Sequence, residues 1–216
     1  LKVLEYCLNS LVKTINFKTT NITLINNCSI HEVGLLVDTY IKNGSIDKYV
    51  YYSENKGKVN AVLSEVRGVY EPYVTIADCD VLFFNGWEQA VFNVFLSHSK
   101  AGVVTPLPIQ YGTFYKNTAV FFDNFFLNKI NYDKVVADED VDLYIEGVNN
   151  SALIKKKGKF NWKEKQYYLK GNTNAIIGAT HFVATYKSSL FRNQYSFPEI
   201  KFKNGYESEF IDKLAD

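Results

Sequence analysis

Apolar and polar positions follow two different periods over the first hundred residues. Apolar residues recur at helical spacing at positions 4, 8, 11, 12 and 15, and again within residues 31–43, 59–66 and 87–97. Between these segments lie short runs rich in β-branched and aromatic residues, at 22–25, 49–52, 73–77 and 101–104. Strands and helices that alternate in this way build a parallel sheet covered by helices. The pattern therefore predicts an α/β fold.

The alternation ends near Pro108. Residues 109–170 contain an aromatic stretch at 121–126, an acidic run at 138–142 and a lysine-rich segment, and the pattern assigns no sheet order to them. Residues 178–186 predict a turn that leads into a strand, and residues 205–215 predict a helix. We expect one domain, with a mostly parallel Rossmann-like half at 1–108 and a mixed half at 109–216.

Composition narrows the classes of partner. The 216 residues carry a formal net charge of +1, which gives no broad electrostatic surface for nucleic acid. No apolar run approaches the roughly 18 residues that cross a bilayer, and the first residues lack a signal-peptide pattern. Cys7, Cys28 and Cys79 have no paired spacing. We expect a cytoplasmic protein with reduced thiols, without a nucleic-acid partner or a transmembrane segment.

The strongest chemical signal is a pair of carboxylates. Asp78 and Asp80 directly follow the predicted strand at 73–77, with one residue between them. Ligands of such sheets bind beyond the carboxyl ends of the strands. Two carboxylates there can bind a hard cation such as Mg²⁺ or Mn²⁺, which offsets the charge of a diphosphate. The alternative is that Asp78-Cys79-Asp80 only caps the helix that follows.

The order of several short motifs resembles family 2 glycosyltransferases of the GT-A fold. The motifs are Leu8–Leu11, Leu24–Ser29, Asn55–Ala61 and Tyr73–Asp80, with Gly178–Tyr186 as an extension. The resemblance covers most of residues 4–104 and the part from 174 onward. It implies transfer of a sugar, with inversion, from a UDP- or GDP-sugar to a carbohydrate or lipid-linked hydroxyl. It also implies a donor half at 1–108, an acceptor half at 109–216, polysaccharide assembly and peripheral membrane association.

The resemblance assigns roles to five residues. Asp80 would be the direct ligand of Mn²⁺ or Mg²⁺, and Asp78 would contact the metal or the donor ribose. Lys58 and Asn60 would hold the base or the phosphates; the alternatives are a solvated charge and a helix-start residue. His181, by its residue type, is a candidate late metal ligand or acceptor contact, with a structural hydrogen-bonding histidine as the alternative. Asn26 stands where the family usually has an aspartate that hydrogen-bonds the nucleobase. This departure leaves the identity of the base open.

Inverting members use a carboxylate as general base toward the acceptor hydroxyl. The segment 206–212 follows the Gly178 turn, as the order of the family requires, and we choose Glu207 from it, with Glu209 second. The acidic run at 138–142 is closer in its letters but precedes the turn. An exposed acidic helix start is the alternative for either segment.

Two other functions stay open. A sugar-phosphate nucleotidyltransferase would share the sheet and the metal-binding aspartate, although no glycine-rich phosphate loop is present in residues 1–216. A non-catalytic sugar-binding or scaffold domain would keep the fold without turnover, and Asn26 favours it. The family also begins with a central strand before the first helix, whereas Leu1 is already close to that helix. We therefore expect either an N-terminal piece that precedes residue 1 or a sheet completed in another way.

Overall fold

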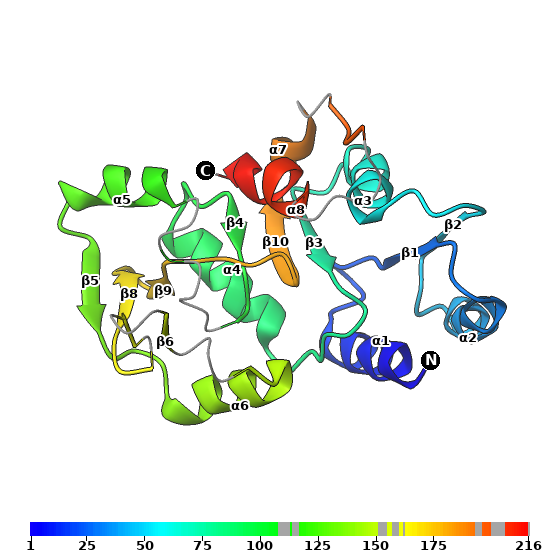
Figure 1. The fold of residues 1–216 in the computed structure, drawn as a ribbon, viewed down its shortest axis with the longest axis horizontal. Coiled ribbons are helices and arrows are strands. Elements are labelled where there is room, and N and C mark those ends of the chain that lie inside the picture. Colours follow the sequence, from blue (N-terminus) through cyan, green and yellow to red (C-terminus); the bar gives the residue numbers. More distant parts are fainter. Residues whose placement is uncertain are drawn as a thin grey trace.

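The predicted order of elements in the first half is confirmed. In a computed structural model, residues 1–107, 113, 117–150, 155–156, 160–161, 163–192, 196–199 and 206–215 are described. Helices and strands alternate as α1 (Lys2–Thr14), β1 (Thr23–Asn27), α2 (His31–Lys42), β2 (Lys48–Tyr52), α3 (Lys58–Val66), β3 (Tyr73–Ala77), α4 (Trp87–Ser97) and β4 (Val103–Val104) (Figure 1).

In the second half, the aromatic and acidic stretches form helices. The order is α5 (Thr118–Phe125), β5 (Ile130–Asp133), α6 (Asp138–Val148), β6 (Lys155–Lys156), β7 (Phe160–Asn161), β8 (Gln166–Leu169), β9 (Ala175–Ile176), β10 (Val183–Lys187), α7 (Ser189–Arg192), α8 (Tyr206–Phe210) and η2 (Asp212–Ala215). The strand after the Gly178 turn and the helix near the C-terminus are thus both present. None of the helices among the described residues is long and apolar enough to cross a membrane.

The sheet differs from the expected mostly parallel layer. The described strands form four small sheets, of which only the β1–β2 pair is parallel. Strand β10 lies between β3 and β4 and is antiparallel to both. After β4 the chain leaves this sheet, forms the elements from α5 to β9, and re-enters the sheet in the opposite direction as β10. Strands β5, β8 and β9 form a separate sheet, and the boundary expected at 108 stays a prediction.

The sheet β3–β10–β4 is covered on both faces. Val74 and Ile76 contact a cluster built around Leu63 of α3, whereas Tyr73 contacts a cluster around Trp87 and Val91 of α4. Neighbouring residues of a strand point to opposite faces, so the two clusters lie on opposite sides of β3. Figure 1 shows α8 next to β10, and Ile211, after α8, is buried in the α3 cluster.

Helix α1 joins the two N-terminal sheets. Its residue Cys7 packs in the α4 cluster with Phe83, whereas Leu8 packs with Val37 of α2 and with Leu24 of β1. Adjacent helix residues point about 100° apart, so one helix can contact two clusters. Strands β1 and β3 are not hydrogen-bonded to each other. Packing of α1 and the contacts of α3 with β1 and β2, rather than strand pairing, therefore hold β1–β2 against the rest.

We expect Leu63→Ala to lower the free energy of unfolding by about 2 to 5 kcal/mol, because it leaves a cavity in the α3 cluster. The Leu63 side chain is fully buried, with 0% of its surface exposed. Leu35→Ala on α2 is the control, since Leu35 is 55% exposed, and it should change stability by no more than about 0.5 kcal/mol. Urea denaturation of both variants measures the difference, and equal effects would contradict this packing.

Candidate active site

Asp78 lies at the carboxyl end of β3 and is held at two points. Its backbone N–H donates to the carbonyl oxygen of Phe182 at 2.8 Å, which extends the β3–β10 pairing by one residue. Its carboxylate Oδ1 pairs with Lys58 Nζ at 2.5 Å, with both side chains partly buried. Strand pairing therefore holds the backbone of Asp78, and Lys58, the first residue of α3, holds its carboxylate.

Two asparagines position the residues before Lys58: Asn27 at the end of β1 and Asn55 after β2. Asn27 Oδ1 accepts from the backbone N–H of Lys56 at 2.8 Å, and Asn55 Oδ1 accepts from that of Gly57 at 2.8 Å. Gly57 has a φ of 78°, which favours glycine. The N–H groups at the start of a helix, with a lysine beside them, suit the phosphates of a ligand.

Asn26 and Asn60 are both engaged within the protein. Asn26 is buried at the end of β1, where its Nδ2 donates to Tyr49 Oη at 2.7 Å and its Oδ1 accepts from the N–H of Ser29 at 2.8 Å. Asn60 Nδ2 donates to the carbonyl of Lys56 at 3.1 Å, whereas its Oδ1 has no partner among the described residues. Contact of either residue with a nucleotide stays a prediction, and the Oδ1 atom of Asn60 is itself buried.

Asp80 is exposed on the turn after β3. The burial of Cys7 raises the pKa of its thiol to about 11, and the nearby charge of Asp80 adds to this shift. Cys7 Sγ lies 3.8 Å from the carbonyl oxygen of Asp78. The carboxylate of Asp80 thus acts on Cys7 of α1 and is itself exposed to solvent.

His181 lies on the turn before β10 and pairs with a residue beyond α8. Its Nδ1 is 3.2 Å from Asp212 Oδ2, which also accepts from Ser208 Oγ at 3.1 Å. The hydrogen bond with Asp212 raises the pKa of His181, while partial burial and the Lys58 charge act against this rise. The negative charge of Glu207 adds to the rise. Lys58 and Glu207 therefore both act electrostatically on His181.

The two base candidates point in different directions. Glu207 influences His181, whereas Glu209 lines a small hollow with Ser196, Phe210, Lys213 and Leu214. Residues two positions apart on a helix do not share a face. The structure therefore brings Glu207, and not Glu209, to the His181 side of α8.

The alternative acidic run has lysine partners elsewhere. On α6, Asp138 pairs with Lys134 at 2.7 Å and Asp142 with Lys163 at 2.5 Å. The hydrogen bond from Lys134 lowers the pKa of Asp138. Figure 1 shows α6 at the opposite edge of the molecule from α8. The run therefore forms a surface of ion pairs on another part of the fold.

No three histidine, cysteine or carboxylate side chains converge as a metal-binding group in the described part of the chain. Mg²⁺ is commonly bound by one or two carboxylates together with substrate phosphates and water, so such a group is not required. The exposed Asp80, next to the lysine-paired Asp78, fits that kind of site.

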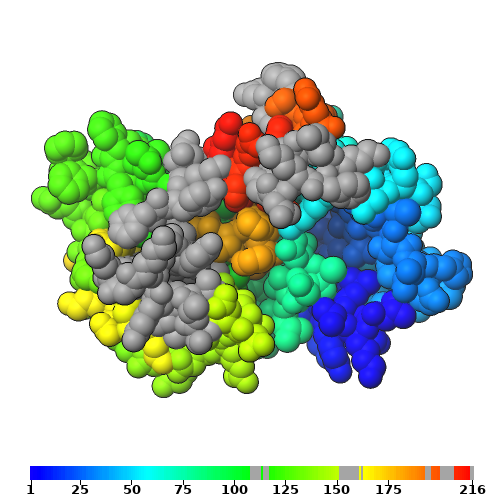
Figure 2. All heavy atoms as spheres, in the orientation of Figure 1, coloured from blue at the N-terminus to red at the C-terminus, as the bar shows by residue number. Residues whose placement is uncertain are grey.

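Segments from both halves of the chain lie next to one another at one surface. In Figure 2, the orange segment before β10 lies between the red C-terminal helix and the teal segment that follows β3. Near it, Thr180 Oγ1 is a buried polar atom without a partner among the described residues. Buried polar groups are normally satisfied, so Thr180 offers a position for a ligand hydroxyl or water.

Comparison with protein-family models decides the family. Residues 1–144 match the model of glycosyl transferase family 2. The chain belongs to this family. A search of curated proteins finds no match. At the family level the chain is a glycosyltransferase, whose substrates are in general a nucleotide-sugar donor and an acceptor. The match includes Lys58, Asp78 and Asp80, whereas His181 and Glu207 lie beyond it.

Sequence reasoning missed three contributors to this candidate site. Asp212 pairs with His181, Ser208 supports Asp212, and the Phe182 carbonyl holds Asp78. Asp212 stands in the acidic segment that supplied Glu207, so its charge was visible. Its partner was not, because 31 residues separate it from His181.

We expect Asp212→Asn to lower the pKa of His181 toward the ordinary value of about 6.5, because it removes the main cause of the rise. A raised folded pKa stabilises the fold fully below the unfolded pKa, and this stability is lost as pH rises through the folded pKa. NMR titration of the imidazole measures the shift. The resonances of His31 and His98 should not respond to the substitution, and an unchanged His181 titration would contradict the pairing.

Proposed function

We propose that this chain transfers a sugar from a UDP- or GDP-sugar to a hydroxyl of a carbohydrate or lipid-linked acceptor, with inversion. The observation that carries the proposal is the cluster of Lys58, Asp78 and Asp80 beside the turn of His181 and the helix of Glu207. It combines groups suited to a diphosphate with a carboxylate suited to a proton. Cytoplasmic polysaccharide assembly is part of the proposal.

The donor half would bind the nucleotide sugar. Lys58 and the first N–H groups of α3 would contact the phosphates, with Asn60 and Asn26 toward the base and Asp78 toward the ribose. Asp80, with Asp78, would hold Mn²⁺ or Mg²⁺, and His181 is the further candidate ligand. When bound, the cation supplies positive charge to the leaving diphosphate. A ligand that binds here replaces the contact between Lys58 and Asp78.

Glu207 would act as general base. Its carboxylate takes the proton of the acceptor hydroxyl while that oxygen forms a bond to the anomeric carbon. The bond between this carbon and the donor phosphate breaks on the opposite face, and the nucleoside diphosphate leaves with the electron pair. The charge of Glu207 acts on His181, which also feels the charge of Lys58. This support for the base comes from the tertiary structure, since the family match ends at residue 144.

One set of contacts favours a non-catalytic scaffold as the second candidate. Asn26 is buried and bonded to Tyr49 and Ser29, and the Asp78 carboxylate is bound by Lys58. A domain that had lost turnover could keep both contacts permanently. Binding of a nucleotide with displacement of Lys58 separates the two functions.

We expect the chain to bind either UDP or GDP more tightly with Mn²⁺ than without it. Asp80→Ala should remove the metal dependence and weaken binding at least about tenfold, because a carboxylate ligand of the cation is lost. Calorimetric titration measures this, with Asp38→Ala on the exposed side of α2 as the matched control. If neither nucleotide binds under any condition, the scaffold function becomes the better account.

Glu207→Gln should lower kcat for sugar transfer about 100-fold or more, since a general base contributes about 10²–10⁴. Donor affinity should stay unchanged. Glu209→Gln is the matched control on the same helix and should keep most activity, because Glu209 lines a different surface. Release of UDP or GDP from the nucleotide sugar, with glycan or lipid-linked acceptors present, measures kcat. Equal losses in both variants would contradict the assignment of the base.

A further inference from the structure

Helix α5 and the turn that follows it expose a cluster of large apolar side chains. Phe122 is 72% exposed, Phe125 67%, Phe126 79% and Leu127 61%. Most of the apolar surface of these side chains therefore faces water, which is unusual for large apolar residues on a helix. No residue of α5 itself is buried. We call these four residues the α5 aromatic patch.

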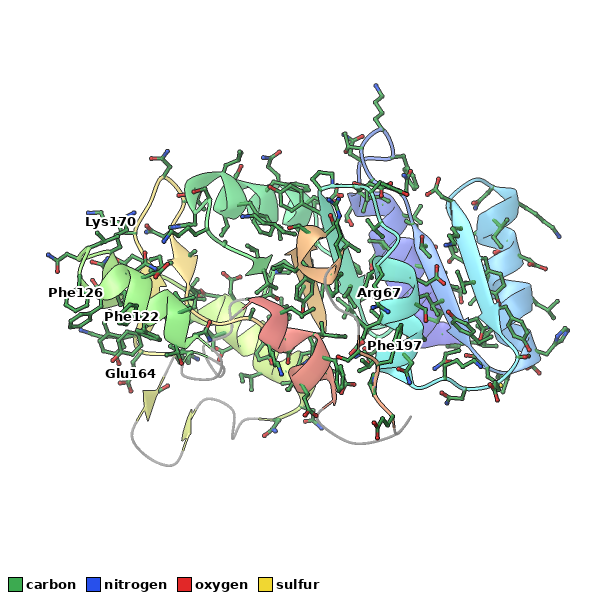
Figure 3. The ribbon with its side chains drawn as sticks, turned by 90° about the horizontal axis from the view of Figure 1, so that it is seen from above. Arg67, Phe122, Phe126, Glu164, Lys170 and Phe197 are labelled. Atoms are coloured by element: carbon green, nitrogen blue, oxygen red, sulfur yellow. The ribbon has the colours of Figure 1, made fainter. Side chains whose placement is uncertain are left out.

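The rings of the patch contact one another rather than the core. Phe125 and Phe126 have ring centroids 5.5 Å apart, and Phe122 and Phe126 6.5 Å apart, both edge to face. Figure 3 shows Phe122 and Phe126 pointing outward at one end of the molecule. At about 200 Å² per large side chain, the four together expose on the order of 500 Å² of apolar surface. A continuous patch of this size commonly marks a binding surface.

Basic residues lie at the rim of the patch. Lys129 follows Leu127 closely in sequence, and its carbonyl accepts from the N–H of Lys170 at 3.0 Å, so these two exposed lysines are neighbours. No ion pair joins either lysine to a carboxylate among the residues that the structure describes. Asp123, the only acidic residue of α5, is paired with Lys100 at 2.8 Å.

The opposite rim carries one carboxylate with a local partner. In Figure 3, Glu164 lies on the other side of Phe122 from Lys170. Its Oε1 accepts from Asn161 Nδ2 at 2.8 Å. Lys165, its neighbour, lies 5.8 Å from the centre of the Tyr132 ring. The patch is therefore a group of aromatic rings with more lysines than unpaired acids around it.

We propose that the α5 aromatic patch docks on the surface of an anionic phospholipid bilayer. The phenylalanine rings enter the boundary between headgroups and acyl chains, and Lys129 and Lys170 contact the lipid phosphates. Aromatic side chains gain apolar contact there and lose few rotamers. With Asp123 neutralised by Lys100, no unpaired charge of α5 opposes this contact.

A second copy of this chain fits the patch less well. In a two-fold symmetric dimer each partner brings Lys129 and Lys170 to the interface, where the described rim offers fewer carboxylates than lysines to offset them. Like charges brought together in this way oppose association, whereas lipid phosphates attract them. The docking is also independent of the donor site, since a variant that transfers no sugar still carries the patch.

Co-sedimentation with lipid vesicles tests the proposal. We expect binding to vesicles of phosphatidylcholine with phosphatidylglycerol, and much weaker binding to phosphatidylcholine alone. The double variant Phe122→Ser/Phe126→Ser should lower the partition coefficient about tenfold or more, because two buried rings are lost. Lys129→Ala/Lys170→Ala should lower it about 25-fold on anionic vesicles only, at about fivefold per lysine.

The matched control is Leu35→Ser/Leu96→Ser, which removes two leucines exposed on α2 and α4. It should bind vesicles as the wild type does, and all three variants should keep the wild-type circular dichroism. Two results overturn the proposal: failure to bind either vesicle, or an equal loss in the control. Concentration-dependent self-association that Phe122→Ser/Phe126→Ser abolishes, measured by sedimentation velocity without lipid, would assign the patch to a dimer instead.

Discussion

The insertion of β10 between β3 and β4 is the constraint on which the candidate site depends. It pairs Val183 with Ala77, and the next hydrogen bond, from Asp78 to Phe182, fixes the first carboxylate of the site. The strand is buried on both faces, with Ala184 and Tyr186 in the α3 cluster and Val183 in the α4 cluster, so a slip of one residue would exchange the side chains that the two clusters receive. A shift of register would move the His181 turn relative to Asp78 and separate the donor side from the C-terminal helix.

Opposite charges then organise the site in the absence of a ligand. Lys58 satisfies Asp78, and Asp212 satisfies His181, so neither partly buried charge is left unpaired. In the proposed function, a diphosphate would attract Lys58 and so release the Asp78 carboxylate. Metal binding and lysine binding would then be linked, because the same carboxylate would serve both.

The family match and the structure concern different halves of the proposed mechanism. The match over residues 1–144 covers the donor side, with Lys58, Asp78 and Asp80. The assignment of His181 and Glu207 depends on tertiary contacts, which bring α8 and η2 against the end of β3. The exposed phenylalanines of α5 lie on neither side, at the end of the molecule seen in Figure 3. If a membrane contacts α5, the proposed chemistry takes place on other elements of the same fold.

The sequence by itself determined the local elements and the position of the two carboxylates at the end of β3. Periodicity located α1 to α4 and the strands between them, because the spacing of apolar residues within one segment indicates whether that segment is a helix or a strand. It also placed Asp78 and Asp80 after a strand, and the order of the motifs indicated the family. The antiparallel entry of β10, the pairing of His181 with Asp212 and the separation of Glu207 from Glu209 were decided only by the tertiary structure. These depend on residues far apart in the chain or on the face of a short helix, and their partners are chosen by packing rather than by spacing.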